Sequence, residues 1–204
     1  DLPPVESQAE SLVDLQARCT EPVDPIAFYD QIAERGLALG PSLRWIEHLW
    51  RGNGEALARV RPPAALAGVD PRQHPGLLDA ALQVAGAVLP ADETGPLYLP
   101  FGIASVRDWN AAGSAVAIIH AQVRAAEPGS VTRTVDVALL DGAGQVQLRL
   151  SGVTLAPALA GALALQAGGV GAQLRDALGA LPALLAAVVE NVGQAAFVVF
   201  GVAA

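Results

Sequence analysis

The sequence predicts an α+β fold in which a curved antiparallel sheet wraps around one long helix. Three observations lead to this prediction. Within the middle of the chain, only residues 74–89 have the length and periodicity of a long apolar helix. The segments that follow it alternate apolar and polar residues, as strands with one covered face do. Asn-Gly and Asp-Gly pairs, which favour tight hairpins, join two pairs of the predicted strands.

The elements are predicted from local signals, starting at the N-terminus. Residues 1–23 contain three prolines and scattered acidic residues around one short apolar patch, and they predict a linker. Asp24 can cap a helix whose first position is Pro25. After a turn marked by a Gly-Pro pair, residues 43–50 and 55–61 predict a hairpin around an Asn-Gly turn.

The second half of the chain predicts the central helix and then an antiparallel meander. Pro75 suits the first turn of the helix over residues 74–89, because its missing N–H costs nothing there. Four strands are expected after it, at residues 98–109, 115–125, 131–141 and 145–156. The chain is therefore divided into a linker (1–23), one domain (24–157) and an Ala/Leu-rich helical tail or inter-domain linker (158–204).

The composition excludes several classes of protein. A net charge of −8 leaves no basic surface for a nucleic acid, and a lone cysteine, Cys19, excludes a disulfide framework and a cysteine metal cluster. The start of the chain lacks a signal peptide, so we expect a cytoplasmic protein that binds no metal and no membrane. Residues 184–204 are long enough to span a bilayer, but Glu190, Asn191 and Gln194 favour a core or dimer-facing helix.

Four short motifs follow one another along the chain, and their order and spacing are informative. They read LALGPSL, LWRGNGEALARVRPP, HPGLLDAALQ and YLPFGIASVR. Their order and spacing over residues 15–157 closely resemble the C-terminal half of the dehydratase domain of modular type I polyketide synthases. The resemblance implies a hot-dog fold, as the second half of a double hot dog.

The resemblance also implies a reaction. Water would be eliminated from a 3-hydroxyacyl thioester carried on the phosphopantetheine of an acyl carrier protein, with no further cofactor. In this family a histidine of the first half removes the α-proton, and the aspartate of the HPxLLD motif protonates the departing hydroxyl. The resemblance places that acid at Asp79 and a supporting polar residue at Gln83, on the same helix face. The motifs imply further substrate-binding residues: His74, Pro75, Leu78, Gly40, Pro41, Tyr98, Leu99, Pro100 and Phe101.

The roles of two candidate residues can also be considered from the sequence alone, without the resemblance to the family. Asp79 lies about one turn into an apolar helix, where a carboxylate is costly unless it is paired or neutralised. Burial would raise its pKa, as a general acid requires, whereas the nearby helix N-terminus would oppose that shift. From the residues alone, a structural or solvated aspartate is as plausible as a functional one. His120, in the middle of a predicted strand, is expected to be hydrogen-bonded or exposed.

The sequence departs from the family at two places. The first-half motif HxxxGxxxxP is absent: His48 and Gly52 match it, but Leu57 stands where proline is required. Leu39 and Leu43 occupy positions that are usually aromatic around the Gly-Pro turn. We therefore do not expect this chain to dehydrate a substrate alone. Three explanations are open: the histidine half lies elsewhere or on another chain, the domain is a degenerate scaffold, or it is repurposed for branching or cyclisation.

The expected partners follow from the same interpretation. An acyl carrier protein and the neighbouring synthase domains would surround this domain. A lone hot dog exposes one sheet edge, and such edges invite pairing. We therefore expect either a first hot-dog half or a homodimer partner to cover it.

Overall fold

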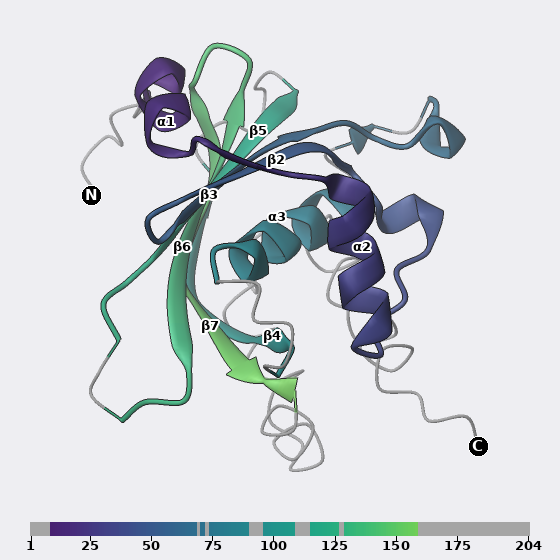
Figure 1. Cartoon of the computed structure of the whole chain (residues 1–204). Coiled ribbons are helices and arrows are strands. Elements are labelled where there is room, and N and C mark those ends of the chain that lie inside the picture. The colour runs from purple at the N-terminus through teal and green to yellow at the C-terminus, as the bar shows by residue number, and fades with distance from the viewer. Residues whose placement is uncertain are drawn as a thin grey trace.

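A curved antiparallel sheet wraps around one long helix, as the sequence predicts (Figure 1). Helix α3 (Pro75–Ala87) lies in the hollow of the sheet, and helix α2 (Pro25–Glu34) lies beside α3. The computed structural model describes residues 9–68, 70–71, 74–89, 96–108, 115–126 and 129–158.

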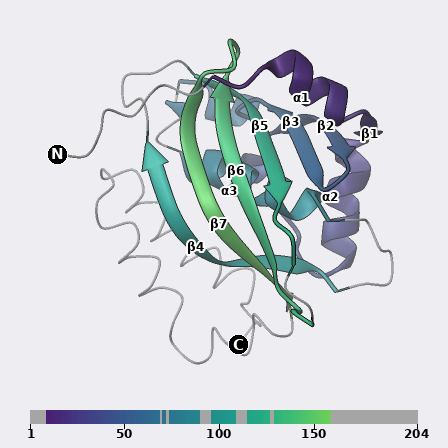
Figure 2. The same ribbon diagram turned by 90° about the vertical axis from the view of Figure 1, so that its left-hand side faces the viewer.

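The sheet has seven strands in the order β1-β2-β3-β5-β6-β7-β4 (Figure 2). Their bounds are β1 Glu21–Val23, β2 Ile46–Gly52, β3 Glu55–Val60, β4 Tyr98–Asp108, β5 Val116–Val123, β6 Arg133–Asp141 and β7 Val146–Pro157. Both predicted hairpins are confirmed, with Gly54 and Gly144 at positive φ in the β2–β3 and β6–β7 turns. The predicted four-strand meander is wrong at its first step. Because β5 pairs with β3, β4 does not pair with β5 and instead forms the edge beside β7.

A side chain caps each of the two helices near the site, and the cap at Asp24 was predicted. The Asp24 carboxylate accepts the Ile26 N–H at 3.0 Å, and Pro25 follows as the first residue of α2. His74 caps α3, and its Nδ1 accepts the Gly76 N–H at 3.0 Å. Each cap satisfies a backbone donor that has no partner inside the helix.

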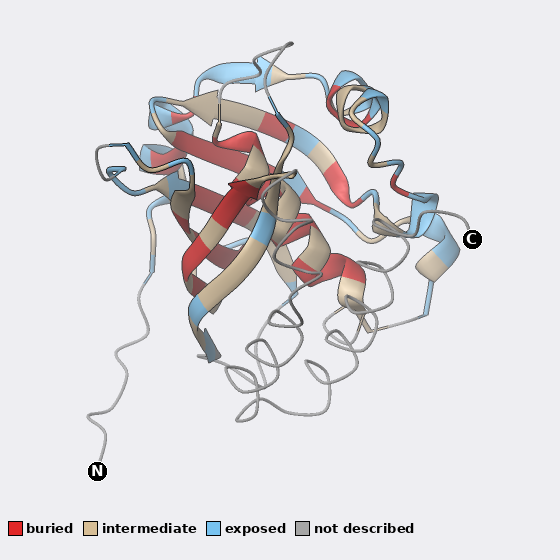
Figure 3. Cartoon of the chain, turned by 90° about the horizontal axis from the view of Figure 1, so that it is seen from below, coloured by how far each residue is buried: buried red, intermediate tan, exposed pale blue. Residues whose placement is uncertain are grey.

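The core lies between α3 and the concave face of the sheet (Figure 3). Helix α3 contacts β3, β4, β5 and β6. Its small residues Ala80, Ala81 and Ala85 are fully buried, which lets the helix approach the strands closely. Because this alanine-rich face is buried, the opposite side of α3, which carries Asp79 and Gln83, faces a pocket.

Residues 12–23 are part of the fold, so the predicted linker is wrong over this stretch. Helix α1 (Leu12–Arg18) covers the convex face of the sheet, and β1 pairs with β2 (Figure 2). Leu15 and Cys19 are buried there against Leu57 and Leu140. A helix of seven residues is too short to be stable alone, so α1 depends on this packing and on the ion pair between its last residue, Arg18, and Glu55 on β3. Residues 1–8 lie outside the described chain.

The predicted helical tail also lies outside the described residues, from residue 159 onward. This includes the apolar stretch at 184–204. Within the part of the chain that the structure describes, no helix is long and apolar enough to cross a bilayer.

Candidate active site

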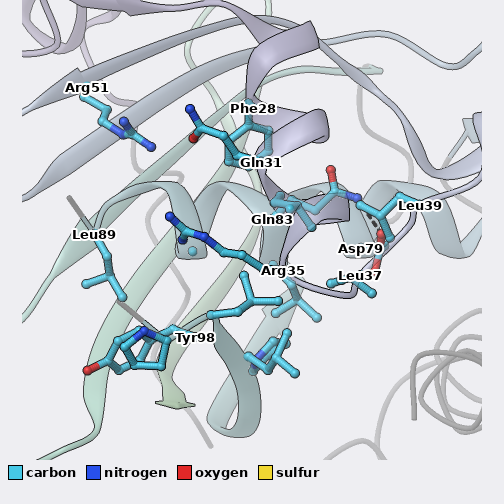
Figure 4. A pocket seen from close by; sticks show the side chains of 17 residues that line it. Phe28, Gln31, Arg35, Leu37, Leu39, Arg51, Asp79, Gln83, Leu89 and Tyr98 are labelled. Carbon is cyan, nitrogen blue, oxygen red and sulfur yellow. Dashed lines mark hydrogen bonds between the residues drawn. The ribbon is translucent and has the colours of Figure 1, made fainter. Parts of the chain in front are cut away.

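A pocket lies between α2, α3 and the start of β4, and both Asp79 and Gln83 line it (Figure 4). Most of its wall is apolar, from Phe28, Ile32, Leu37, Leu39, Leu82, Leu89 and Leu97. Two arginines, Arg35 and Arg51, also contribute to the wall. The pocket therefore combines an apolar surface with a single carboxyl group among the described residues.

Asp79 is partly buried in this wall, and its surroundings favour the protonated form. Burial raises the pKa of Asp79 from 3.8 to about 6, although a hydrogen bond from Gln83 opposes the rise. That bond runs from Gln83 Nε2 to Asp79 Oδ2 at 2.5 Å. A carboxyl group with this pKa can release a proton near neutral pH, as a general acid must.

Gln83 is held on three sides. Its Nε2 donates to the Leu43 carbonyl at 3.0 Å as well as to Asp79. Its Oε1 accepts the Tyr29 hydroxyl at 3.1 Å. The amide thus links α2, the turn before β2 and the carboxyl on α3.

None of the three histidines lines the pocket. His48 is exposed on β2, where its ring stacks on Trp50. His74 caps α3 and stacks on Trp45. His120 lies on the convex side of the sheet, where Glu55 and Glu10 contact its two ring nitrogens. The expectation of a hydrogen-bonded strand histidine is confirmed at His120, and the sheet separates this residue from Asp79.

A family model described as "Polyketide synthase dehydratase N-terminal domain" matches residues 7–165. This chain belongs to the polyketide synthase dehydratase family. The solved dehydratases to which it is similar have the hot-dog fold, so the predicted fold class is confirmed.

Three relatives illustrate the similarity. Mycoketide-CoA synthase of Mycobacterium tuberculosis is 34% identical over 143 residues, which are 67% of this chain and 3% of that protein. A trans-AT dehydratase domain from Brevibacillus brevis has 26% identity and a TM-score of 0.65, covering 75% of this chain and 54% of the solved one. The CurK dehydratase H→F inactive mutant has 29% identity and a TM-score of 0.62, covering 74% and 53%. The chain thus spans about half the length of the solved dehydratase domains and a small fraction of the curated synthases.

The dehydratase pocket brings together five of the predicted site residues. Asp79 and Gln83 enter it from α3. Tyr98, Leu99 and Pro100 enter it from the edge strand β4. Their meeting depends on β4 lying at the far edge of the curved sheet, a placement that the predicted meander did not contain.

The other six predicted substrate-binding residues do not line this pocket. His74 and Pro75 start α3, and Leu78 points into the core, where it is 6% exposed. Gly40 and Pro41 are exposed at the start of the 3-10 turn η1 (Pro41–Leu43), while their neighbour Leu39 contributes to the pocket. Phe101 is the residue after Pro100 on β4 and is likewise absent from the wall. As substrate-binding residues these six stay predictions.

Sequence reasoning did not find three residues that shape the site. Tyr29 supports Gln83 from α2, and Phe28 forms part of the pocket wall. Arg51 donates from Nε to the Ala87 carbonyl at 2.7 Å, which satisfies an acceptor at the end of α3. The only available signal was the Phe-Tyr pair in an otherwise ordinary helix pattern, and that pair equally well predicts core packing.

The Trp45 indole fixes the start of the acid-bearing helix. It packs directly on Gly76, and a Cβ atom added to Gly76 would overlap it. The Trp45 Nε1 also donates to the Ser42 carbonyl at 2.8 Å, so the ring cannot move freely. Glycine at this position in the HPGLLD motif is therefore required by packing.

We expect the substitution Gly76→Ala to lower the free energy of unfolding by about 1–3 kcal/mol, the usual cost of overpacking. Gly86→Ala on the same helix is a matched control, because its nearest contact would be at 4.0 Å. The control should be neutral or stabilising by up to about 1 kcal/mol, since alanine favours a helix over glycine. Urea unfolding of the two variants measures both effects. Equal stability changes would contradict this account of Gly76.

Proposed function

We propose that this domain is the acid-bearing half of a polyketide synthase dehydratase. In this proposal Asp79 protonates the β-hydroxyl that leaves a 3-hydroxyacyl chain held on an acyl carrier protein. The observation that carries it is the partly buried Asp79 carboxyl in an apolar pocket, with a pKa of about 6. An ordinary aspartate would hold a proton far less often near neutral pH.

The apolar wall suits the acyl chain of such a substrate. Leucines at 37, 39, 82 and 89 would contact methylene groups, while Asp79 supplies the polar contact to the hydroxyl. The cavity has a volume of about 120 Å³, which is below the range of roughly 300–1,000 Å³ for ligand pockets. A further wall from another domain would enlarge it.

The base is proposed to come from outside the described residues. Elimination needs one group for the α-proton and one for the leaving oxygen. Two forms of the CurK dehydratase described as inactive carry a histidine-to-phenylalanine and an aspartate-to-asparagine substitution, so that relative depends on both residue types. None of this chain's histidines lines the pocket, so only the aspartate would be supplied here.

We assign the chain to the second hot dog of the pair. The matched family model is named for an N-terminal domain, but the motif series ending in HPGLLDAALQ and YLPFGIASVR favours the second half. Coverage of about half of each solved dehydratase agrees with one hot dog of two. The strands β1 and β4 form the sheet edges, and a second hot dog could pair with either.

Reconstitution tests this proposal. The chain is mixed with a 3-hydroxyacyl acyl carrier protein, with and without a separately expressed histidine-bearing first half from the same synthase. Mass spectrometry should detect loss of one water only when both halves are present, and the substitution Asp79→Asn should abolish it. Dehydration by the chain alone would disprove the missing base, and no dehydration by the folded pair would count against the function.

A scaffold or a repurposed module is the second candidate. It is favoured by Leu39, which lines the pocket where the resemblance expects tyrosine. With leucine there, this part of the pocket wall offers no hydroxyl to a bound oxygen. A parent synthase that forms its product equally well with Asp79→Asn would favour the scaffold.

A further inference from the structure

Tyr29 lies behind the pocket wall, and its hydroxyl connects the backbone of Ile46 to Asp79 through the Gln83 amide. The side chain is 5% exposed and does not line the pocket. Its ring packs edge-to-face with the Phe28 ring at a centroid distance of 5.5 Å, and the Arg44 guanidinium lies 5.3 Å from its centre. The hydroxyl lies between the Ile46 N–H at 3.2 Å and Gln83 Oε1 at 3.1 Å.

Two backbone groups, the Ile46 N–H and the Leu43 carbonyl, determine the direction of each hydrogen bond around Tyr29 and Gln83. A backbone N–H can only donate, so the Tyr29 oxygen accepts from Ile46 and its own proton points to Gln83 Oε1. A backbone carbonyl can only accept, so the Leu43 oxygen takes a proton from Gln83 Nε2. Both contacts place the amide oxygen towards Tyr29 and the amide nitrogen towards Asp79.

This orientation makes the two oxygens of Asp79 inequivalent. The second proton of Gln83 Nε2 points to Asp79 Oδ2, so Oδ2 must act as an acceptor. When the carboxyl group is neutral, its proton therefore belongs on Oδ1. Among the described residues, Oδ1 has no hydrogen-bond partner, and it remains available for a ligand in the pocket.

We propose that Tyr29 is a positioning residue that holds the Gln83 amide in one orientation, so that Asp79 presents its proton from Oδ1. That the proton then reaches a departing β-hydroxyl rests on the proposed function. The orientation itself does not depend on turnover. Without the hydroxyl, Gln83 Oε1 would lose its only donor among the described residues. The amide would keep its bond to the Leu43 carbonyl but lose its connection through Tyr29 to the Ile46 backbone.

The first test removes the hydroxyl and follows the titration of Asp79. The full chain is labelled with ¹³C at the aspartate carboxyl carbons, and the Asp79 signal is assigned by its loss in Asp79→Asn. In Tyr29→Phe, a weakened bond from Gln83 should raise the pKa of Asp79 further, by about one unit. Tyr98→Phe is the matched control, because it removes the other tyrosine hydroxyl beside the pocket without touching this chain of bonds. A folded Tyr29→Phe chain in which Asp79 titrates as in the wild type would overturn the proposal.

The second test keeps the hydroxyl, in case Tyr29→Phe does not fold. The chain has only two tyrosines, so 3-fluorotyrosine in the Tyr98→Phe background labels Tyr29 alone. Its ¹⁹F resonance should titrate with the same midpoint as Asp79 and become insensitive to pH in Asp79→Asn. The titration should also be strongly diminished in Gln83→Leu, because the coupling runs mainly through the amide. Because the Asp79 charge also acts on Tyr29 directly, a small residual titration is expected in Gln83→Leu. A titration that is undiminished in Gln83→Leu would overturn the role of Tyr29.

These readouts separate the two proposals. A coupled titration in a chain that never dehydrates, even with its first half, would leave the positioning role intact and refute the proposed function. Dehydration by the two halves together, with a Tyr29 resonance that does not follow the titration of Asp79, would support the proposed function and refute the positioning role.

Discussion

If the proposed function holds, replacing Asp79 with asparagine is expected to abolish dehydration by the reconstituted pair of hot dogs. In the chain alone, the same substitution is expected to stabilise the fold above pH 6. Loss of a general acid typically costs a factor of about 10²–10⁴ in rate. Asparagine has nearly the same shape, and its carbonyl can still accept the proton of Gln83 Nε2. The substitution therefore removes the charge and the acid while keeping the contact.

The expected gain in stability depends on pH in a definite direction. The folded-state pKa of Asp79, about 6, is above its ordinary value of 3.8, so folding disfavours the charged form. The cost is absent below about pH 4, grows between about pH 4 and pH 6, and is complete above that range. A rise of this size corresponds to about 3 kcal/mol. Asp79→Asn should therefore stabilise the chain by up to about 3 kcal/mol at pH 8 and by little at pH 4.

Urea unfolding of wild type and Asp79→Asn at pH 4 and pH 8 measures this difference. Asp136→Asn on β6 is a control of opposite sign. Burial alone would raise the pKa of Asp136, but hydrogen bonds from Arg124 and the Gly152 N–H outweigh it and lower the pKa. That variant should lose stability at pH 8. A gain for Asp79→Asn that is equal at both pH values would contradict a raised pKa of Asp79 in the folded chain.

Removing Glu55 is expected to destabilise the fold strongly through its contacts on the convex face. Glu55 is 7% exposed on β3 and bonds both the Arg18 guanidinium at 3.0 Å and His120 Nε2 at 2.8 Å. Glu10 contacts the other nitrogen of His120 and pairs with Arg149 at 2.7 Å. Breaking a buried ion pair by removing one partner costs about 3–5 kcal/mol. Because Arg18 is half exposed and can regain water, we expect Glu55→Ala to cost about 3 kcal/mol.

Glu47→Ala provides the matched control for this prediction. Glu47 on the neighbouring strand pairs with Arg61, whose side chain is 72% exposed, and such surface pairs contribute about 1 kcal/mol or less. Urea unfolding at pH 7 should separate the two variants by about 2 kcal/mol. Hydrogen exchange should also show faster opening of α1 in Glu55→Ala. Equal costs for both variants would mean that the convex-face cluster is electrostatically no stronger than a surface pair.

The same cluster predicts sensitivity to acid. A hydrogen bond to His120 is the largest cause that lowers the pKa of Glu10 to about 2, against an ordinary value of 4.5. The stability that Glu10 contributes is therefore present above about pH 4.5 and is lost as the pH falls towards 2. This direction is opposite to that of Asp79, so the two carboxyl groups can be distinguished in one pH series.

The local sequence determined the parts of this fold that depend on short-range signals. Asp24-Pro25 set the start of α2, and the Asn53-Gly54 turn set the register of the β2–β3 hairpin. The HPGLLDAALQ motif placed Asp79 and Gln83 one turn apart on the helix, and this spacing allows their hydrogen bond. Each of these features depends on only a few neighbouring residues, so local propensity and spacing are enough to predict it.

The tertiary structure alone decided which distant residues meet. Helix α1 is too short for a periodic signal, and it exists because the convex face buries Leu15 and Cys19. Strand β5 pairs with β3 and β6, so β4 lies beside β7 instead, and no local sequence pattern predicts this pairing. Tyr29 reaches Gln83 across 54 positions because α2 packs next to α3. Long-range contacts of this kind depend on the packing of whole elements. The positions of Asp79 and Gln83 on one helix face could therefore be predicted from the sequence, and the contact of Tyr29 with Gln83 could not.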